Sequence, residues 1–183
     1  MNSRVRAVVR CGCVALVLFS NPVRANDCTL SLSQSQIELG ALRPGGLALA
    51  PGQPDLFLGS RRLSLNIACP WPTSMVLRFE AVAAGPQAFR FARQGRFTVG
   101  LSNARLDGKP VTLATTQRPT EAAASRLLEP GQSLVVLAQD RPVKGRFFSA
   151  QVEVDTHLPL SATRVHDETP VEGRGRFELL SGE

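Results

Sequence analysis

Regular alternation of apolar and polar residues is the feature of this chain that most constrains its fold. The pattern runs through residues 62–69 and 74–81, and it returns in residues 97–101, 150–154 and 174–179. Successive side chains of a β-strand point to opposite faces, so a period of two predicts strands with one buried face. The chain is therefore predicted to be all-β.

Turn-forming residues separate these stretches. Asp107 and Gly108 form the strongest hairpin signal, and Pro130 with Gly131 marks a loop. The 13 prolines and 15 glycines fit many short strands joined by turns, which is typical of a sandwich or a barrel. Residues 120–128, rich in alanine, are the single helical candidate, and we expect either one short surface helix or a loop there.

The N-terminus has the order of a secretory signal peptide. Three arginines among the first ten residues precede a short apolar run over 11–19, and small residues then lead to a predicted cleavage site after Ala25. The apolar run is too short to cross roughly 30 Å of hydrocarbon as a helix. We therefore predict a signal peptide over 1–25 and one exported domain over 26–183, without stable insertion into a membrane.

Removal of this segment changes the charge of the protein. The whole chain has a net charge of +6, but the segment carries four of its 21 Lys and Arg and none of its 15 Asp and Glu. The exported domain keeps a net charge of about +2, and its arginines are scattered and not interleaved with aromatic residues. No nucleic-acid partner is therefore expected.

The cysteines agree with export. Cys11 and Cys13 leave with the signal peptide, so the mature chain keeps only Cys28 and Cys69, in a compartment that oxidises thiols. We predict a disulfide between them, which would close a loop of about 42 residues and stabilise the fold by about 4 kcal/mol. Two cysteines and two distant histidines are too few ligands for a metal site. No metal or cofactor is predicted.

The sequence contains no recognisable catalytic constellation. His157 and His166 are its only histidines, and neither a G-x-S-x-G nor an H-E-x-x-H motif is present. We therefore predict no catalytic residues and no enzymatic activity. Trp71 lies between Pro70 and Pro72, which predicts a rigid turn. An indole has a large apolar area to bury, so we expect Trp71 to cap the end of the domain in preference to binding a sugar.

The cysteines and the alternating stretches occur in a definite order. The predicted signal peptide is followed by a first cysteine that opens a strand, and an apolar-x-apolar-Gly turn comes after it. A second cysteine, with forty residues between it and the first, ends an alternating strand, and another alternating strand follows directly. The chain closes on an alternating run with glycine and phenylalanine. These stretches are residues 28–32, 37–42, 63–69, 75–79 and 173–180. Together these four features resemble the subunits of chaperone–usher (type 1-like) fimbriae, or fimbria-like relatives of those pilins.

The resemblance implies an immunoglobulin-like β-sandwich that lacks one strand. The first and last strands, within residues 29–39 and 173–180, would flank a groove that a periplasmic chaperone fills first and a neighbouring pilus subunit fills after assembly by an outer-membrane usher. This is strand addition to an open sheet edge. The implied location is the periplasm and then the fimbrium at the cell surface, with a role in cell adhesion. The groove residues would be Leu30, Leu32, Ile37, Leu39, Gly175, Phe177 and Leu179.

The chain also departs from the family pattern. It has no tyrosine, so Phe177 is the nearest candidate for the aromatic residue that the family carries near its C-terminus. Only Asn26 and Asp27 precede Cys28 after the predicted cleavage, which leaves no donor segment. A subunit that accepts a strand but donates none belongs at the tip of a fibre or outside its shaft.

Two other classes of protein remain as alternatives. A free-standing secreted or periplasmic binding module with a complete sandwich would show the same core pattern. A small outer-membrane β-barrel would suit the size and the alternation. The cysteine pair and the 5% aromatic content disfavour the barrel.

Overall fold

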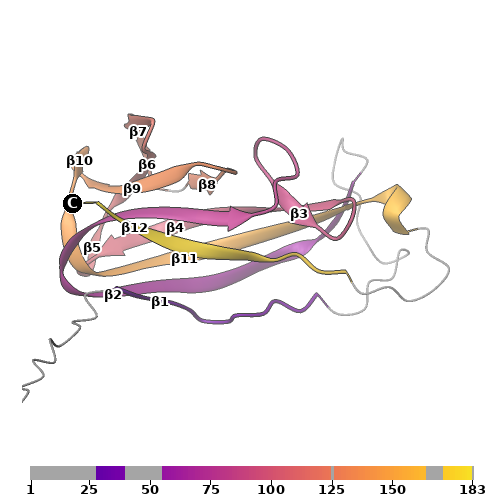
Figure 1. The fold of residues 1–183 in the computed structure, drawn as a ribbon, viewed down its shortest axis with the longest axis horizontal. Helices are drawn as coiled ribbons and strands as arrows, with labels where there is room; N and C mark the ends of the chain where they lie inside the picture. The colour runs from indigo at the N-terminus through magenta and orange to yellow at the C-terminus, as the bar shows by residue number, and fades with distance from the viewer. Residues whose placement is uncertain (1–27, 40–54, 125, 164–170, 183) are drawn as a thin grey trace, which may run out of the picture.

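The computed structural model describes residues 28–39, 55–124, 126–163 and 171–182 (Figure 1). The predicted signal peptide over 1–25 lies outside the described residues. Apart from one short 3-10 segment, Leu160–Thr163, the regular structure of the described residues consists of antiparallel β-strands. The prediction of an all-β protein is confirmed.

Twelve strands are joined in one hydrogen-bonded sheet. Its main path is β3-β4-β11-β2-β9-β6-β7; β1 and β12 also pair with β2, β5 and β8 with β4, and β10 with β9. The strands are β1 (Thr29–Leu32), β2 (Asp55–Ala81), β3 (Phe89–Phe91), β4 (Gly95–Leu106), β5 (Lys109–Pro110), β6 (Thr112–Thr115), β7 (Arg118–Ala123), β8 (Arg126–Leu128), β9 (Ser133–Ala138), β10 (Arg141–Pro142), β11 (Lys144–Pro159) and β12 (Gly175–Gly182).

The long strand β2 organises the molecule because it turns back on itself at one end (Figure 1). Its first arm, residues 55–69, pairs with β11 and with β1. Its second arm, residues 74–81, pairs with β12 and with β9. The bend falls at Pro70-Trp71-Pro72, where the two prolines have no N–H to donate to a ladder.

Both arms of β2 bury their apolar positions in the same core. The first arm alternates buried and exposed residues strictly from Arg62 to Cys69, and the second arm buries every second residue from Met75 to Phe79. All of these buried side chains belong to one cluster. The predicted inward faces of these two stretches are therefore confirmed.

The predicted hairpin at Asp107-Gly108 is also present. Leu106 pairs with Lys109, and the two turn residues have positive φ angles of 50° and 79°. A two-residue turn with both φ angles positive matches the twist of the strands that it joins.

The expectation for residues 120–128 is wrong. These residues form neither a helix nor a plain loop: β7 reaches Ala123 and pairs with β6, and Arg126–Leu128 is strand β8. Leu128 lies fully buried opposite Val99 of β4. Helix propensity is a weak local preference, and it loses to the hydrogen bonds and apolar burial that an open edge of β4 offers.

The expected burial of Trp71 is wrong as well. The indole is exposed, and so are Pro70 and Pro72 on either side of it. The chain leaves the face of the core at Cys69 and returns to it at Met75, so the residues between them pass around the end of the core.

Candidate partner-strand site

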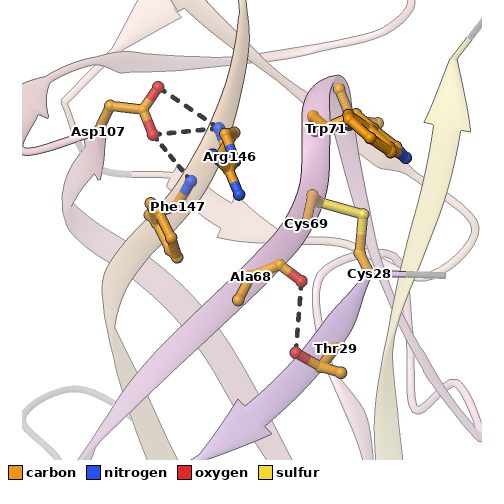
Figure 2. The surroundings of a disulfide bond; sticks show 9 residues. Cys28, Thr29, Ala68, Cys69, Trp71, Asp107, Arg146 and Phe147 are labelled. Carbon is orange, nitrogen blue, oxygen red and sulfur yellow. Dashed lines mark hydrogen bonds between the residues drawn. A yellow bond between two sulfur atoms is a disulfide. The ribbon is translucent and has the colours of Figure 1, made fainter. Parts of the chain in front are cut away.

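Strand β1 is held to the first arm of β2 by a covalent bond and a short ladder. Cys28 and Cys69 form the predicted disulfide, with their Cα atoms 4.2 Å apart (Figure 2). Directly after it, Thr29 pairs with Ala68, and the Thr29 hydroxyl donates a hydrogen bond to the Ala68 carbonyl at 3.3 Å. The ladder continues to the pair formed by Leu32 and Leu65.

Strand β12 is held to the second arm by aromatic packing on its inner side. Phe177 lies opposite Phe79, and the two ring centroids are 5.0 Å apart in an edge-to-face arrangement. Phe79 also contacts the buried rings of Phe89 and Phe97, so Phe177 extends an aromatic cluster of the core. Gly175 is required two residues earlier, because a Cβ at this position would collide with the Phe79 ring.

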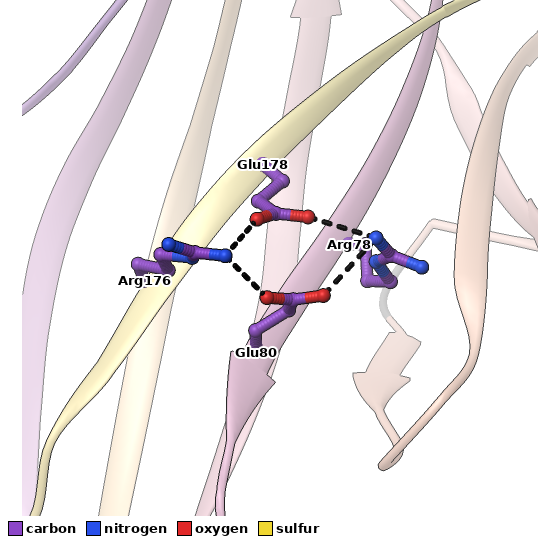
Figure 3. A network of polar contacts seen from close by, with 4 residues as sticks. All are labelled: Arg78, Glu80, Arg176 and Glu178. Carbon is purple, nitrogen blue, oxygen red and sulfur yellow. Dashed lines mark hydrogen bonds and ion pairs between the residues drawn. The ribbon is translucent and has the colours of Figure 1, made fainter.

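The other side of β12 takes part in a closed ring of four ion pairs, two of them between β12 and β2 and one within each strand (Figure 3). Arg78 pairs with Glu178 at 2.8 Å and with Glu80 at 3.0 Å. Arg176 pairs with Glu80 at 2.7 Å and with Glu178 at 2.6 Å. Because Arg176 lies opposite Glu80 and Glu178 lies opposite Arg78, the ring closes in one register of the ladder only. We call these four residues the charge quartet.

The charge quartet shifts the pKa values of three of its members. The hydrogen bond from Arg78 is the largest cause of a lowered pKa for the Glu178 carboxyl. The same bond raises the pKa of Arg78, and the bond to Glu80 raises that of Arg176. Each of these three shifts favours the charged form of its group, so the ion pairs between Glu178 and the two arginines are present near neutral pH.

The outer edges of β1 and β12 have no strand beside them within the described residues, since each of the two strands pairs with β2 alone. Along a strand, alternate backbone N–H and C=O groups point to opposite sides. Half of those groups on β12 therefore point away from β2, and the same holds for β1.

The predicted groove residues lie along these two strands and the segment that follows β1. Leu30, Leu32, Ile37, Leu39, Phe177 and Leu179 are all half-buried and pack against the core, and Gly175 is exposed. Leu30 and Leu32 lie in the ladder with the first arm of β2, whereas Gly175, Phe177 and Leu179 lie in the ladder with the second arm, so different parts of one strand carry the two predicted walls. Their role in binding a partner strand stays a prediction.

The alternation over residues 174–179 predicts that Arg176 and Glu178 lie on the face of the last strand opposite Phe177 and Leu179, where they do lie, but it does not reveal their partners on β2. A signal for them exists. Arg78-x-Glu80 and Arg176-x-Glu178 carry the same order of charges, so antiparallel pairing of the two strands brings opposite charges together.

Only one of the two histidines lies within the described residues. His157 is half-buried beside Phe57, with the ring centroids 5.2 Å apart, and burial is the largest cause of its lowered pKa. His166 lies outside the described residues. Among the residues that the structure does describe, no cluster of three or more His, Cys, Asp or Glu side chains is placed to hold a metal ion.

Within the described part of the chain, no helix is both long and apolar enough to span a bilayer. No protein-family model matches the chain, and no curated protein matches its sequence. The sheet, the disulfide and the two strand edges are therefore the features on which an interpretation of function rests.

Proposed function

We propose that this chain is a fimbrial or fimbria-like subunit whose immunoglobulin-like sandwich lacks one strand and accepts a partner strand between β1 and β12. The observation that carries the proposal is the incomplete pairing and burial of β12. Its outer edge has no strand beside it among the described residues, while Phe177 and Leu179 are only half-buried on the core. An added strand would complete both the hydrogen bonds and the burial.

The physical basis of capture is strand addition. The free N–H and C=O groups of an edge strand bind the backbone of an added strand, and apolar positions select its alternate side chains. Leu30, Leu32, Ile37 and Leu39 supply such positions from the β1 side. An uncovered edge of this kind is also a site for aggregation, which favours a partner that is bound throughout the life of the protein.

The partners that fit this proposal are a periplasmic chaperone, an outer-membrane usher and a neighbouring pilus subunit. The exported protein would accept a strand at the edge of β12 and donate none, which places it at the tip of a fibre or beside its shaft. Its contribution would then be to adhesion at the cell surface. A free-standing module would instead need no partner strand to reach its full stability.

Thermal unfolding in the presence of a synthetic strand tests the proposal. A peptide with alternating apolar residues should raise the melting temperature, because it binds the folded state alone. The same peptide with every second amide N-methylated keeps its side chains but loses strand hydrogen bonds, and it should have little effect. A melting temperature that neither peptide moves would favour the free-standing module and overturn the proposal.

A matched pair of variants tests the site. Phe177→Gln and Arg176→Gln place the same residue at neighbouring positions on opposite faces of β12. We expect Phe177→Gln to weaken peptide capture by at least ten-fold, the effect of losing about 1.5 kcal/mol of apolar burial. Arg176→Gln should reduce capture far less. Equal losses in the two variants would contradict the assignment of the inner face.

A further inference from the structure

Three turns meet at one end of the molecule, beside the start of β11. The Asp107-Gly108 hairpin adjoins it through the pair of Leu106 with Phe148. The turn between β9 and β10 leads directly into it. The bend of β2 faces it, because the ladder between β2 and β11 is irregular between the pairs Thr73–Gly145 and Ala68–Phe147.

Two aromatic side chains project from this end into solvent. Trp71, in the bend of β2, is 60% exposed, and Phe147, in the irregular part of β11, is 56% exposed. Both belong to the segments that face each other across the interrupted ladder. Aromatic rings of this size are ordinarily buried in part, so their joint exposure at one end of a folded domain indicates a contact surface.

Hydrogen bonds and the nearby disulfide fix the backbone that carries the two exposed rings (Figure 2). The Asp107 carboxylate accepts hydrogen bonds from the backbone N–H groups of Arg146 at 3.0 Å and Phe147 at 2.8 Å, and the Asp107 N–H donates to the Phe147 carbonyl at 2.7 Å. Trp71 follows the disulfide-bonded Cys69 by two residues, and its carbonyl accepts a bond from the Thr73 hydroxyl at 2.9 Å. Little backbone conformational entropy is therefore lost when these segments enter a contact.

The segments that carry the rings are also rich in positive charge. The turns and the start of β11 carry five exposed basic side chains, among them the only two lysines of the sequence. Of the acidic residues in the same segments, Asp107 is engaged by backbone N–H groups and Asp140 alone is otherwise available. The basic residues are Arg105, Lys109, Arg141, Lys144 and Arg146. We call them, with Trp71 and Phe147, the basic-aromatic end.

We propose that the basic-aromatic end docks on the surface of an anionic bilayer, with Trp71 and Phe147 in the headgroup layer and the basic side chains at lipid phosphates. Tryptophan favours the interface between water and lipid, and each basic residue near an anionic surface adds attraction. The rings project from separate segments, the bend of β2 and the start of β11, so one extended fluid surface can contact both rings and the basic side chains together. This inference is independent of the edges of β1 and β12.

The chain contains a probe of this contact, because Trp71 is its only tryptophan. Folded, disulfide-bonded protein should show a blue shift of tryptophan emission, and protection from a soluble quencher, on addition of vesicles made of equal parts phosphatidylcholine and phosphatidylglycerol. Vesicles of phosphatidylcholine alone should produce little change, and added salt should reverse the effect because it screens exposed charges. Unchanged emission with the anionic vesicles would overturn the proposal.

Two double charge-reversal variants separate the effect of the proposed site from the effect of net charge. Lys109→Glu with Lys144→Glu should weaken partition to the anionic vesicles by about thirty-fold or more, the loss expected for two basic residues at such a surface. Arg61→Glu with Arg93→Glu makes the same change in net charge away from the three turns, at exposed positions in β2 and just before β4. This control should bind nearly as well as the unchanged chain. Equal weakening in both would contradict the proposed site.

The aromatic contribution has its own control. Phe147→Ala should weaken vesicle binding, whereas Val82→Ala, at an exposed apolar position outside the three turns, should not. Circular dichroism would show that each variant is folded. A soluble polyphosphate that shifts Trp71 emission as strongly as the anionic vesicles do would show that the end binds polyanions in general, and would overturn the assignment to a bilayer.

Discussion

The two terminal strands of the described fold, β1 and β12, both pair with β2 alone, but they are held by different forces. A disulfide joins the residue before β1 to the first arm of β2. Strand β12 is held to the second arm by a ladder, by Phe177 on the aromatic cluster and by the charge quartet. The disulfide does not respond to salt or acid, whereas the charge quartet responds to both.

This difference separates a permanent attachment from an adjustable one. β1 keeps its place through a bond that survives any rearrangement of the core. β12 depends on its register, because a slip by one residue would turn Phe177 outward and bring Arg176 and Glu178 against the core. The strand that carries the proposed capture edge is thus the strand whose position depends most on noncovalent contacts.

The largest expected effect comes from removing the covalent attachment. Cys28→Ala should lower the free energy of unfolding by about 2–5 kcal/mol, the usual range for the loss of a native disulfide in a small secreted domain. Denaturant unfolding of the oxidised protein and of the variant measures the loss. A variant as stable as the parent would show that β1 is held by its ladder and not by the disulfide.

The apolar attachment of β12 should rank second. Phe177→Ala removes a half-buried ring from its contact with Phe79, and we expect a loss of about 1 kcal/mol in the free energy of unfolding, since half-burial contributes about half of what full burial does. Phe147→Ala removes a ring that is mostly exposed, and it should cost much less. The denaturant concentrations at the midpoint of unfolding compare the two losses, provided that the free energy of unfolding falls with denaturant at the same slope in both variants. Similar losses would contradict the view that Phe177 extends the core.

Loss of an ion pair of the charge quartet should lower the free energy of unfolding by a smaller amount, and this amount should depend on pH. The pKa of Glu178 is lowered in the folded protein, chiefly by Arg78, from an ordinary value of 4.5. Its contribution is therefore complete above that value and is lost as the pH falls through the lower folded pKa. Glu178→Gln should remove this dependence and leave Phe177 in place. Unfolding curves followed from neutral to acidic pH in both proteins check it, and identical profiles would exclude a role for Glu178.

Stability should also depend on pH through His157, at a higher pH than through Glu178, and the two contributions have to be separated. Burial lowers the pKa of His157 in the folded protein, with Arg96 adding to the effect and Asp155 and Asp55 opposing it. The unfolded chain then takes up more protons just below the ordinary value of 6.5, so stability falls there as the pH falls. His157→Gln should abolish this step and leave the Glu178 step unchanged. Loss of both steps would mean that the two sites are coupled.

The local pattern of residues determined much of this protein. Alternation predicted which side chains of β2 face the core, because the period of a strand belongs to its own backbone. The Asp107-Gly108 turn was equally readable, since its positive φ angles depend on the two residues that form it. The cysteine pair needed only the assumption of an oxidising compartment, and Cys28–Cys69 is present.

Tertiary structure decided what depends on distant neighbours. Residues 120–123 and 126–128 became strands because β6 and β4 offered edges to them. β9 buries both of its faces, Leu134 and Val136 toward the main core and Val135 and Leu137 toward a smaller cluster, so a period of two cannot reveal it. The exposure of Trp71 follows from the path of β2 around the end of the core. Within the described residues, the uncovered edges of β1 and β12 exist only once pairing is complete, because a strand edge is defined by the neighbour that it lacks.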